Sequence, residues 1–596
     1  MKVDQQLNLT ETGAHVDAAE EGSLGFDGKE ILDGETHALP DLVRGDGDKE
    51  AVNDGASVQD GVRQAEAITA TWSKTSLTTV YIFFWLTYAV NAFQSSITSN
   101  LTAFVTSGFE EHSLIPVISI VSNVMSAVAY MVLAKILDLW DRSYGYLVMT
   151  AFATIGLILS AACTDIYTYC AAQCFYSVGF IGIIFTVDVY TADTSKLKDR
   201  GLAYAFTASP WIITAYAGPA ISQRFYEDNW RWAFGCFAII LPVVGLPFFG
   251  IMQWHKRKAE KLGKLAKVKS DKTWVQLTIH YLIEFDILGV FLVSAGMVLF
   301  LVPFSIAASA ANEWRTAHII VMLVLGILCL VAFVIVERFF SPKPFVQYHL
   351  LTSRTVLGAC LLDFTWQIAY YCWYSYFTSY LQVVYHLSIS TAGYISSIYD
   401  VVAAVWMFPV GYLIRRTGQY KWLLYVGVPL YTLGEGLMIY FRKPGHSVGW
   451  IVFTQILIAI GGSSFTIVQQ VAVLAAGSHK DAAAMLALLG LFGYFGGAVG
   501  NSISGAIWTN TLPDALQKYL PADALADWET IYDSLDVQLS YPVGDPVREA
   551  ISLAYAEAQS RMLIAGTAVM GLACLCVLLI KNIKVSEIEQ VKGVLF

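Results

Sequence analysis

The sequence predicts an all-α protein that crosses a membrane many times, and two observations lead to this class. Hydrophobic residues make up 56% of the 596 residues and charged residues only 14%, with a mean hydropathy of +0.55. A soluble domain has roughly 45–50% apolar and about 25% charged residues. Apolar runs also recur along the chain at the length of about 20 residues that a helix needs to cross a bilayer. Because a helix satisfies its own backbone hydrogen bonds there, we expect helices throughout.

The N-terminal stretch differs from the rest of the chain. Its first 66 residues carry 16 acidic and five basic residues, whereas the whole chain has a formal net charge of −10. The stretch has no apolar core, which predicts a disordered acidic tail over residues 1–75. It also lacks the basic and apolar regions of a cleaved signal peptide.

Fourteen apolar runs follow this tail. With the N-terminus inside, the cytosolic connections and the C-terminal tail carry 23 Lys and Arg, and the outer connections carry eight. The positive-inside rule therefore predicts that both termini are cytosolic. The predicted helices begin near Thr78, Ile115, Gly145, Tyr167, Leu202, Trp232, Phe285, Ala317, Val356, Thr391, Lys421, Gly449, Ala482 and Met562.

The composition argues against several other classes. The nine cysteines lie mostly in apolar runs, without a CxxC pair or a histidine at ligand spacing, so we expect buried thiols and no metal site. The basic residues form no nucleic-acid footprint. The ten histidines are scattered and no ATP-binding motif is present, so we expect neither an enzyme nor a cofactor.

Two predicted cytosolic connections resemble one known loop. "AKILDLWDRSYG" (residues 134–145) and "GYLIRRTGQYK" (residues 411–421) each place a small residue four positions before a charge, at Asp138 and Arg415. This spacing resembles the G-x-x-x-D-[RK]-x-G-[RK] loop that occurs in both halves of the major facilitator superfamily. The first copy has Asp141 in place of the glycine, and the second has arginine in place of the aspartate.

That resemblance implies a major facilitator fold with 14 transmembrane helices, in two pseudo-symmetric six-helix bundles plus two extra helices. The implied parts are two bundles (76–254 and 355–580), a basic cytosolic loop (255–284), two additional helices (285–354) and a cytosolic tail (581–596). Loop charges in such a fold can lock one of two states of a rocking bundle.

Longer stretches resemble the fungal siderophore-iron transporters of the 14-helix branch. They cover residues 191–219, 374–395, 465–476 and 488–521, the last containing "GNSISGAIWTNTLP". Within that family the chain looks most like the Aspergillus carriers of triacetylfusarinine C. The resemblance implies proton-coupled import of a ferric hydroxamate chelate by alternating access.

The same resemblance implies a monomer in the plasma membrane, with the ferric siderophore, protons and the lipid bilayer as its partners. An endosomal vesicle is the alternative location. A proton-linked exchanger or exporter of glutathione or drugs is the alternative function, because one fold hosts many functions. The fourth helix lacks the arginine of drug antiporters, which counts against drug efflux.

Four acidic residues lie within apolar runs: Asp188, Asp363, Asp400 and Glu435. A charge inside a bilayer costs at least about 2.5–3.5 kcal/mol, and a desolvated carboxylate can hold a proton near neutral pH. We therefore interpret these four as candidates for proton coupling. A structural, hydrogen-bonded acid is the alternative for each of them.

The loop after the fourth helix carries a second set of candidate residues. Asp193 and Arg200 lie seven residues apart across a loop with two lysines, and we predict that they form a gating ion pair. A plain loop charge is the alternative. Together with Asp138, Arg142 and Arg415 they form the predicted cytosolic gate.

Aromatic and amide side chains are the candidates for substrate binding, since a large, oxygen-rich chelate needs aromatic faces and neutral donors. Tyr370, Trp373 and Tyr376 recur at three-residue spacing, with Asp363 about two turns earlier, which predicts one shared face toward a cavity. Lipid offers amides no partner, so we expect Gln469 or Gln470, or both, to face the interior.

The longest predicted outer segment covers residues 509–561 and contains nine acidic and three basic residues. Tyr532, Tyr541 and Tyr555 in it are candidates for first capture of the ligand, with loop packing as the alternative. Asn100 begins an N-glycosylation sequon near the first outer loop. A match this short arises often by chance, so it does not by itself predict glycosylation.

The helix before this segment is rich in glycine. Gly493 and Gly497, and likewise Gly496 and Gly500, have GxxxG spacing, which lets helix backbones approach closely. We therefore expect this helix to pack against a neighbour rather than to form the cavity. We expect Trp508 at its end to anchor it at the membrane interface.

Overall fold

The computed structural model describes residues 64, 68, 71–139, 141–263, 274–346, 348–477 and 481–587. The predicted acidic tail up to residue 63, residues 264–273 of the basic loop and the last nine residues of the C-terminal tail lie outside this part. All regular secondary structure in the described ranges is helical, which confirms the all-α class.

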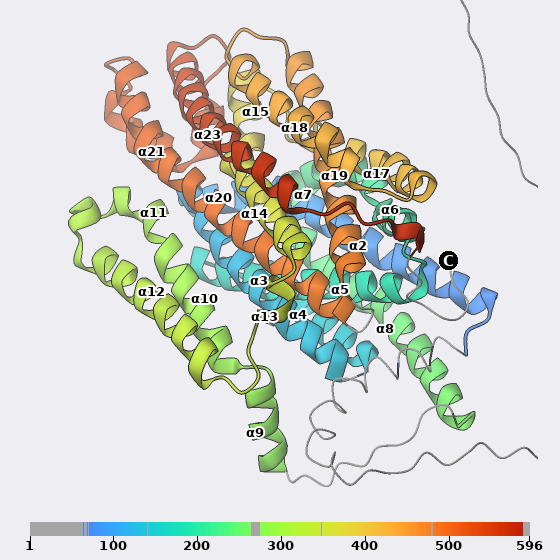
Figure 1. Ribbon diagram of the computed structural model, residues 1–596. Coiled ribbons are helices and arrows are strands. Elements are labelled where there is room, and N and C mark those ends of the chain that lie inside the picture. Colours follow the sequence, from blue (N-terminus) through green and yellow to red (C-terminus); the bar gives the residue numbers. More distant parts are fainter. Residues whose placement is uncertain are drawn as a thin grey trace, which may run out of the picture. The chain divides into compact units, whose positions relative to one another are not determined.

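The helices of the N-terminal part pack on one another. Helix α4 lies against α5 and α8, whereas α2 lies against α7 and α8 (Figure 1). Their bounds are α2 (Lys74–Ser107), η1 (His112–Leu114), α3 (Ile115–Leu139), α4 (Arg142–Ala162), α5 (Ile166–Thr194), α6 (Arg200–Ala208), α7 (Trp211–Asp228) and α8 (Trp232–Lys261).

Among the described residues, five further α-helices lie between the N-terminal and C-terminal parts: α9 (Trp274–Glu284), α10 (Ile287–Leu301), α11 (Pro303–Ile306), α12 (Ala317–Ile335) and α13 (Tyr348–Leu351). Figure 1 shows α10 and α12 as a pair, with α10 beside α3 and α11 beside α20 (Ala482–Tyr519). The Ser502 hydroxyl of α20 donates to the Leu301 carbonyl oxygen at 2.9 Å. This pair therefore contacts both the N-terminal and the C-terminal helices.

The C-terminal helices pack mainly around α14, which contacts α19, α20 and α23. Their bounds are α14 (Arg354–Tyr374), α15 (Phe377–Tyr385), α16 (Ile389–Ser396), α17 (Ile398–Thr417), α18 (Lys421–Phe441), α19 (Val448–Ala476), α20 as above, α21 (Trp528–Asp533), α22 (Leu535–Ser540) and α23 (Pro546–Leu579).

Twelve helices among the described residues are long and apolar enough to cross a membrane. The spans expected near Leu202 and Val356 correspond to α6 with α7 and to α14, which are not among those twelve. Predicted starts at Ile115, Ala317 and Ala482 coincide with the observed ones. Hydropathy therefore located most of the helices correctly.

The predicted outer segment 509–561 is largely helical. Helix α20 continues to Tyr519, and α23 begins at Pro546, so both ends of the segment are helical. Proline suits the first helical position, and the Asp545 carboxylate caps this helix by accepting from the Val547 amide at 2.8 Å. Only residues 520–545 connect the two helices, and they contain α21 and α22.

Several of the predicted spans are interrupted, and three of the breaks contain serine. These three lie at Ser209 and Pro210 between α6 and α7, at Ser375 and Tyr376 between α14 and α15, and at Ser397 between α16 and α17. An interrupted helix exposes backbone and hydroxyl groups where it lines a cavity. The breaks therefore place polar groups inside an otherwise apolar bundle.

Candidate functional site

Two cavities lie between the N-terminal and C-terminal helices. The helical bundle has two ends, which we name by what lies there. The basic end is the one with Arg142, Arg200 and Arg415, and the loop end is the one with α21 and α22. The loop-end cavity has a volume of about 260 Å³ and the basic-end cavity about 270 Å³. Helix α2 borders the first with residues 95–103 and the second with Tyr88.

The loop-end cavity is polar but uncharged, since none of its described lining residues is acidic or basic. Its hydroxyl groups come from Ser95, Thr98, Ser99, Thr102, Ser119, Ser122, Ser126, Ser177, Ser375 and Thr378. Its amides are Asn123, Gln173 and Asn501, and its rings are Tyr176, Phe180, Tyr371, Tyr374 and Tyr494. Such a wall can donate hydrogen bonds to a neutral, oxygen-rich molecule and stack on its apolar parts.

The cavity near the basic end has two carboxylates in its wall. Asp188 of α5 and Asp363 of α14 both line it. The Tyr88 hydroxyl donates to Asp188 Oδ1 at 2.7 Å. With its amide nitrogen turned toward the carboxylate, Gln469 donates to Asp363 Oδ1 at 3.1 Å. Two of the four predicted acids thus face one cavity from opposite parts of the chain.

Both amides of α19 line the basic-end cavity, as was predicted for at least one of them. Gln469 is buried against Asp363, whereas Gln470 is the more accessible of the two. The other two predicted acids lie elsewhere. Asp400 of α17 lines two smaller cavities, and Glu435 of α18 is fully buried outside the lining of either large cavity.

Tyr494 of α20 separates the two large cavities, because its side chain lines both. Its ring centroid lies 5.6 Å from that of Tyr130 on α3. Gly490 makes room for this pair, since a Cβ there would come within 2.7 Å of the Tyr130 ring. The two rings therefore lie at the boundary between the two cavities.

The predicted roles of the α20 glycines divide between two faces. Gly496 and Gly500 lie against the α14 backbone, and a Cβ on Gly500 would come within 2.7 Å of the Ile368 carbonyl oxygen. This is the predicted close packing. Gly490 and Gly493 line the basic-end cavity instead, so the expectation that this helix stays out of the cavity is wrong.

The predicted aromatic face of α14 also needs correction. Tyr371 and Tyr374 line the loop-end cavity, whereas Tyr370, Trp373 and Tyr376 are not among the lining residues. The Arg442 guanidinium lies 4.1 Å from the centroid of the Trp373 ring. The cavity therefore uses the neighbouring helical face.

Tyr376 instead joins the core with Trp508. The two rings stack with centroids 3.7 Å apart, and both side chains are fully buried. Trp508 is thus a core residue and not the interfacial anchor that its sequence position predicted. Its aromatic neighbours provide the apolar contacts that lipid was expected to supply.

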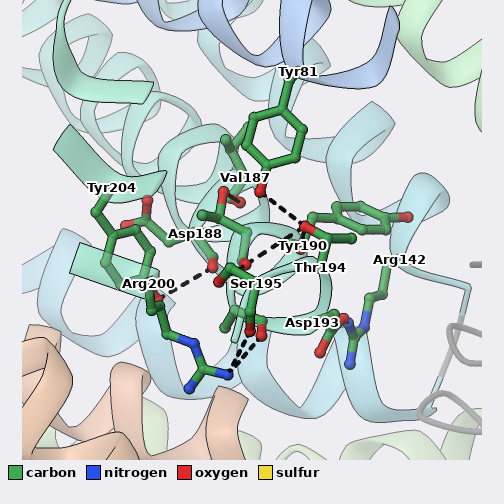
Figure 2. Close-up of polar contacts among 12 residues, drawn as sticks. Tyr81, Arg142, Val187, Asp188, Tyr190, Asp193, Thr194, Ser195, Arg200 and Tyr204 are labelled. Carbon is green, nitrogen blue, oxygen red and sulfur yellow. Dashed lines mark hydrogen bonds and ion pairs between the residues drawn. The ribbon is translucent and has the colours of Figure 1, made fainter. Parts of the chain in front are cut away.

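At the basic end, Asp193 of α5 forms an ion pair with Arg142 of α4, and both side chains are buried (Figure 2). The prediction paired Asp193 with Arg200. Arg200 instead directs its guanidinium to the carbonyl oxygens of Ala192 and Ser195, at 2.8 and 3.2 Å. It thereby caps the end of α5, whose last carbonyl groups lack partners within the helix.

The repeated loop has more than one function in the structure. Asp138 is buried at the end of α3. Asp141, at the position where the resembling loop has glycine, caps α4 by accepting from the Ser143 amide at 2.9 Å and pairs with Lys256 at 3.0 Å. Asp141 is therefore the residue of this loop that caps a helix.

Arg415 contacts the other part of the chain. Its Nε lies 2.9 Å from Asp199 Oδ1, which joins α17 to the turn before α6. Nearby, a Cβ on Gly411 would come within 2.8 Å of the Gly201 backbone. Asp199 was not predicted, because a loop aspartate beside two lysines gave no sign of a distant partner.

At the loop end, α21 and α22 connect the C-terminal helices to the N-terminal helices. The Ser113 hydroxyl donates to Asp533 Oδ1 at 3.3 Å, and the Leu535 amide donates to Ser107 Oγ at 3.1 Å. Burial raises the pKa of Asp533 to about 6, although the Ser113 hydroxyl opposes this shift. This connection therefore contacts the N-terminal helices directly.

The three candidate tyrosines of this segment differ in exposure. Tyr532 is buried, and Tyr555 is fully buried and donates to Gln538 Oε1 at 2.6 Å. Tyr541 is partly exposed. Tyr532 and Tyr555 therefore pack in the interior, which is the alternative considered for them. Ligand capture by the three tyrosines stays a prediction.

Comparison with known proteins adds the family. A family model described as "Fungal trichothecene efflux pump (TRI12)" matches residues 43–385, and one described as "Major Facilitator Superfamily" matches residues 355–512. The chain is 62% identical to "MFS siderochrome iron transporter D" of Aspergillus fumigatus, over 93% of each chain. It is 47% identical to "Siderophore iron transporter mirB" of Emericella nidulans, over 92% of this chain and 93% of that protein.

Two solved structures resemble the fold. A bacterial homologue of the human lysosomal transporter Spinster has a TM-score of 0.53 at 13% identity, covering 85% of this chain and 98% of its own. A mutant of the peptide transporter POT has a TM-score of 0.52 at 13% identity, covering 88% of this chain and 99% of its own. At this identity the likeness concerns the fold alone.

Proposed function

Because the chain belongs to the fungal siderophore-iron transporters of the major facilitator superfamily, we propose that it imports ferric siderophore chelates across the plasma membrane, driven by protons. The protein is a transporter and not an enzyme. The observation that carries the proposal is the pairing of two cavities, one uncharged and rich in hydroxyl groups and rings, the other acidic.

The loop-end cavity suits a hydroxamate chelate such as ferric triacetylfusarinine C. In such a chelate the iron is already enclosed by oxygen ligands, so the protein needs no metal ligands of its own. Hydroxyl and amide groups can bind the chelate's outer oxygen atoms, and Tyr371 and Tyr374 can contact its apolar arms.

The basic-end cavity suits proton coupling. Asp188 and Asp363 face it without a basic residue among its lining residues. A carboxylate in such surroundings takes up a proton more readily than one in water. Asp188 and Asp363 are therefore the first candidates among the four acids, followed by Asp400, whereas Glu435 lies outside both large cavities.

The proposed cycle is alternating access. Each large cavity is smaller than the roughly 300–1,000 Å³ of typical ligand pockets, so a large chelate needs the N-terminal and C-terminal helices to separate. The Arg415 and Asp199 pair would open toward the cytosol, and the contacts of Ser107 and Ser113 would open toward the outside. The Arg142 and Asp193 pair would keep α4 and α5 together meanwhile.

This proposal includes the predicted layout. Fourteen spans form two six-helix halves (76–254 and 355–580) with two extra helices (285–354), and the chain works as a monomer. The basic end faces the cytosol, since the predicted cytosolic connections and the C-terminal tail carry 23 Lys and Arg and the outer connections carry eight. Both termini are then cytosolic, and the loop end faces the outside.

Export is the alternative function, and one observation favours it: the family model that matches the larger part of the chain describes an efflux pump. Uptake of radio-iron in a fungus without its own siderophore carriers separates the two. We expect accumulation of ferric triacetylfusarinine C, inhibited by other ferric hydroxamates in order of affinity. No accumulation with any hydroxamate chelate, together with proton-linked efflux of another solute, would support the exporter.

A further inference from the structure

Asp400 lies beside a second set of cavities, away from the direct route between the two large ones. A cavity of about 100 Å³ and one of about 160 Å³ both have Asp400 and Trp211 in their walls. They lie where the break between α6 and α7 meets the break between α16 and α17. The 100 Å³ cavity is polar enough for water, whereas the 160 Å³ cavity offers water mainly Asp400, Ser463 and Thr466 among apolar side chains; neither can hold a chelate.

These small cavities adjoin the large ones at both sides. The 100 Å³ cavity shares Ser95, Ser99 and Tyr374 with the loop-end cavity. The 160 Å³ cavity shares Trp366 and Thr466, among others, with the basic-end cavity. The four cavities therefore adjoin one another in series past Asp400, beside the boundary that Tyr494 forms between the two large ones.

The walls of this series carry groups that can pass a proton. Ser99 Oγ lies 3.5 Å from the Tyr374 hydroxyl, at the first shared wall. Ser96 borders the same cavity, and its hydroxyl is buried without a hydrogen-bond partner in the described structure. A buried hydroxyl without a partner is costly, which indicates that water occupies this space.

Around Asp400 the facing titratable groups are phenols. They are Tyr370, Tyr371 and Tyr374 of α14 and Tyr399 of its own helix. The facing residues of α2, α7 and α19 are Ser, Asn, Trp and Thr. The described residues give Asp400 no ion pair, so its charge state can change without breaking one.

We propose that Asp400 is a proton relay on a side path that connects the two large cavities and that the chelate cannot enter. A proton from water in the loop-end cavity joins the Asp400 carboxylate. It then leaves to water in the 160 Å³ cavity and protonates Asp363 or Asp188, which restores the Asp400 carboxylate. This inference rests on the proposed proton-driven import and assigns the proton a route separate from that of the chelate.

The test uses the full-length protein in proteoliposomes. Ferric triacetylfusarinine C is supplied outside, with an imposed pH gradient that is acid outside, and both chelate uptake and internal pH are recorded. For Asp400→Asn we expect the chelate Kd to stay within about threefold of the unchanged protein. We expect gradient-driven accumulation to fall by roughly 100-fold, the lower end of what a positioned proton-transfer group contributes.

Four further measurements make this result specific to the relay. Exchange of labelled for unlabelled chelate without a gradient should persist in Asp400→Asn, and Asp400→Glu should restore accumulation. Asp228→Asn, which neutralises an exposed carboxylate at the end of α7, should behave like the unchanged protein. Thr466→Val, on the wall shared by the 160 Å³ and basic-end cavities and outside the loop-end cavity, should slow accumulation and leave chelate binding intact.

Accumulation and internal acidification by Asp400→Asn at the rate of the unchanged protein would overturn the side path. Loss of accumulation in Asp400→Asn together with loss of chelate exchange would overturn it as well, because the residue would then act on the chelate itself. If the unchanged protein takes up chelate without any response to the gradient, proton coupling fails, and the side path fails with it.

Discussion

At the scale of single residues, helix α14 shows how a shift of one position changes a binding wall. Successive residues of a helix differ by about 100° in direction. Tyr371 and Tyr374 therefore face the loop-end cavity, while Trp373 packs on Arg442. The sequence predicted an aromatic, amide-lined site but could not select the face, because aromatic residues surround this helix.

Tyr371→Ala should weaken chelate binding, because it removes a ring from the loop-end cavity. An aromatic contact contributes about 0.5–1.5 kcal/mol beyond its area, so we expect the KM for uptake to rise by roughly 2- to 10-fold with little change in maximal rate. Tyr167→Ala is the matched control, since that ring is 81% exposed. An equal KM for both variants would remove Tyr371 from the binding wall.

Asp533 gives a prediction for pH. Its pKa is about 6 in the folded protein and about 3.9 in an unfolded chain. Between these values the folded state holds more protons, so this residue lowers stability as pH rises from about 4 to about 6. Asp533→Asn should therefore match the Tm of the unchanged protein near pH 4 and exceed it at pH 7. A constant Tm difference across that range would contradict the assignment.

The acids of the site were easier to find than the gate. A carboxylate in an apolar run is conspicuous, so Asp188 and Asp363 could be selected from the sequence. Asp199 could not, because its partner Arg415 lies more than 200 residues away. Long-range pairs of this kind depend on the packing of whole helices.

At the scale of elements, α20 depends on its glycines. The sequence predicted the close packing through GxxxG spacing, and Gly496 and Gly500 fulfil it against α14. It could not show that Gly490 and Gly493 face a cavity, because the spacing is the same on both faces. Which face is buried depends on the neighbours that the fold supplies.

Gly496→Ala should destabilise the protein, because the added methyl group would collide with the Phe364 backbone. Overpacking of this kind costs typically about 1–3 kcal/mol. Gly571→Ala on α23 is the control, since a Cβ there meets nothing within 4 Å. Thermal unfolding followed by size-exclusion chromatography should separate the two variants, and equal stability would contradict the close packing of α14 and α20.

At the scale of the whole molecule, the N-terminal and C-terminal helices meet at both ends. Arg415 with Asp199 joins them at the basic end, and Asp533 with Ser113 joins them at the loop end. Alternating access requires one of these connections to open while the other holds. Hydropathy and loop charge could predict the spans and their orientation, but not which side chains connect the two parts.

Arg415→Glu should favour the cytosol-open state, and Arg415→Glu with Asp199→Lys should restore the balance. The Arg415 side chain is 54% exposed, so the pair contributes only about 0.2–1 kcal/mol, and high salt should weaken it. We expect up to about a fivefold change in labelling of a cysteine placed in the basic-end cavity. Additive effects in the double variant would show that the two residues do not interact.

The central claim is import of a ferric chelate driven by protons. The most direct test measures the initial rate of radio-iron triacetylfusarinine C uptake by intact cells as the outside pH is lowered. We predict a rate that rises with the inward proton gradient and collapses when a protonophore is added. Chelate uptake that ignores both the gradient and the protonophore, or net export of the chelate, would contradict it.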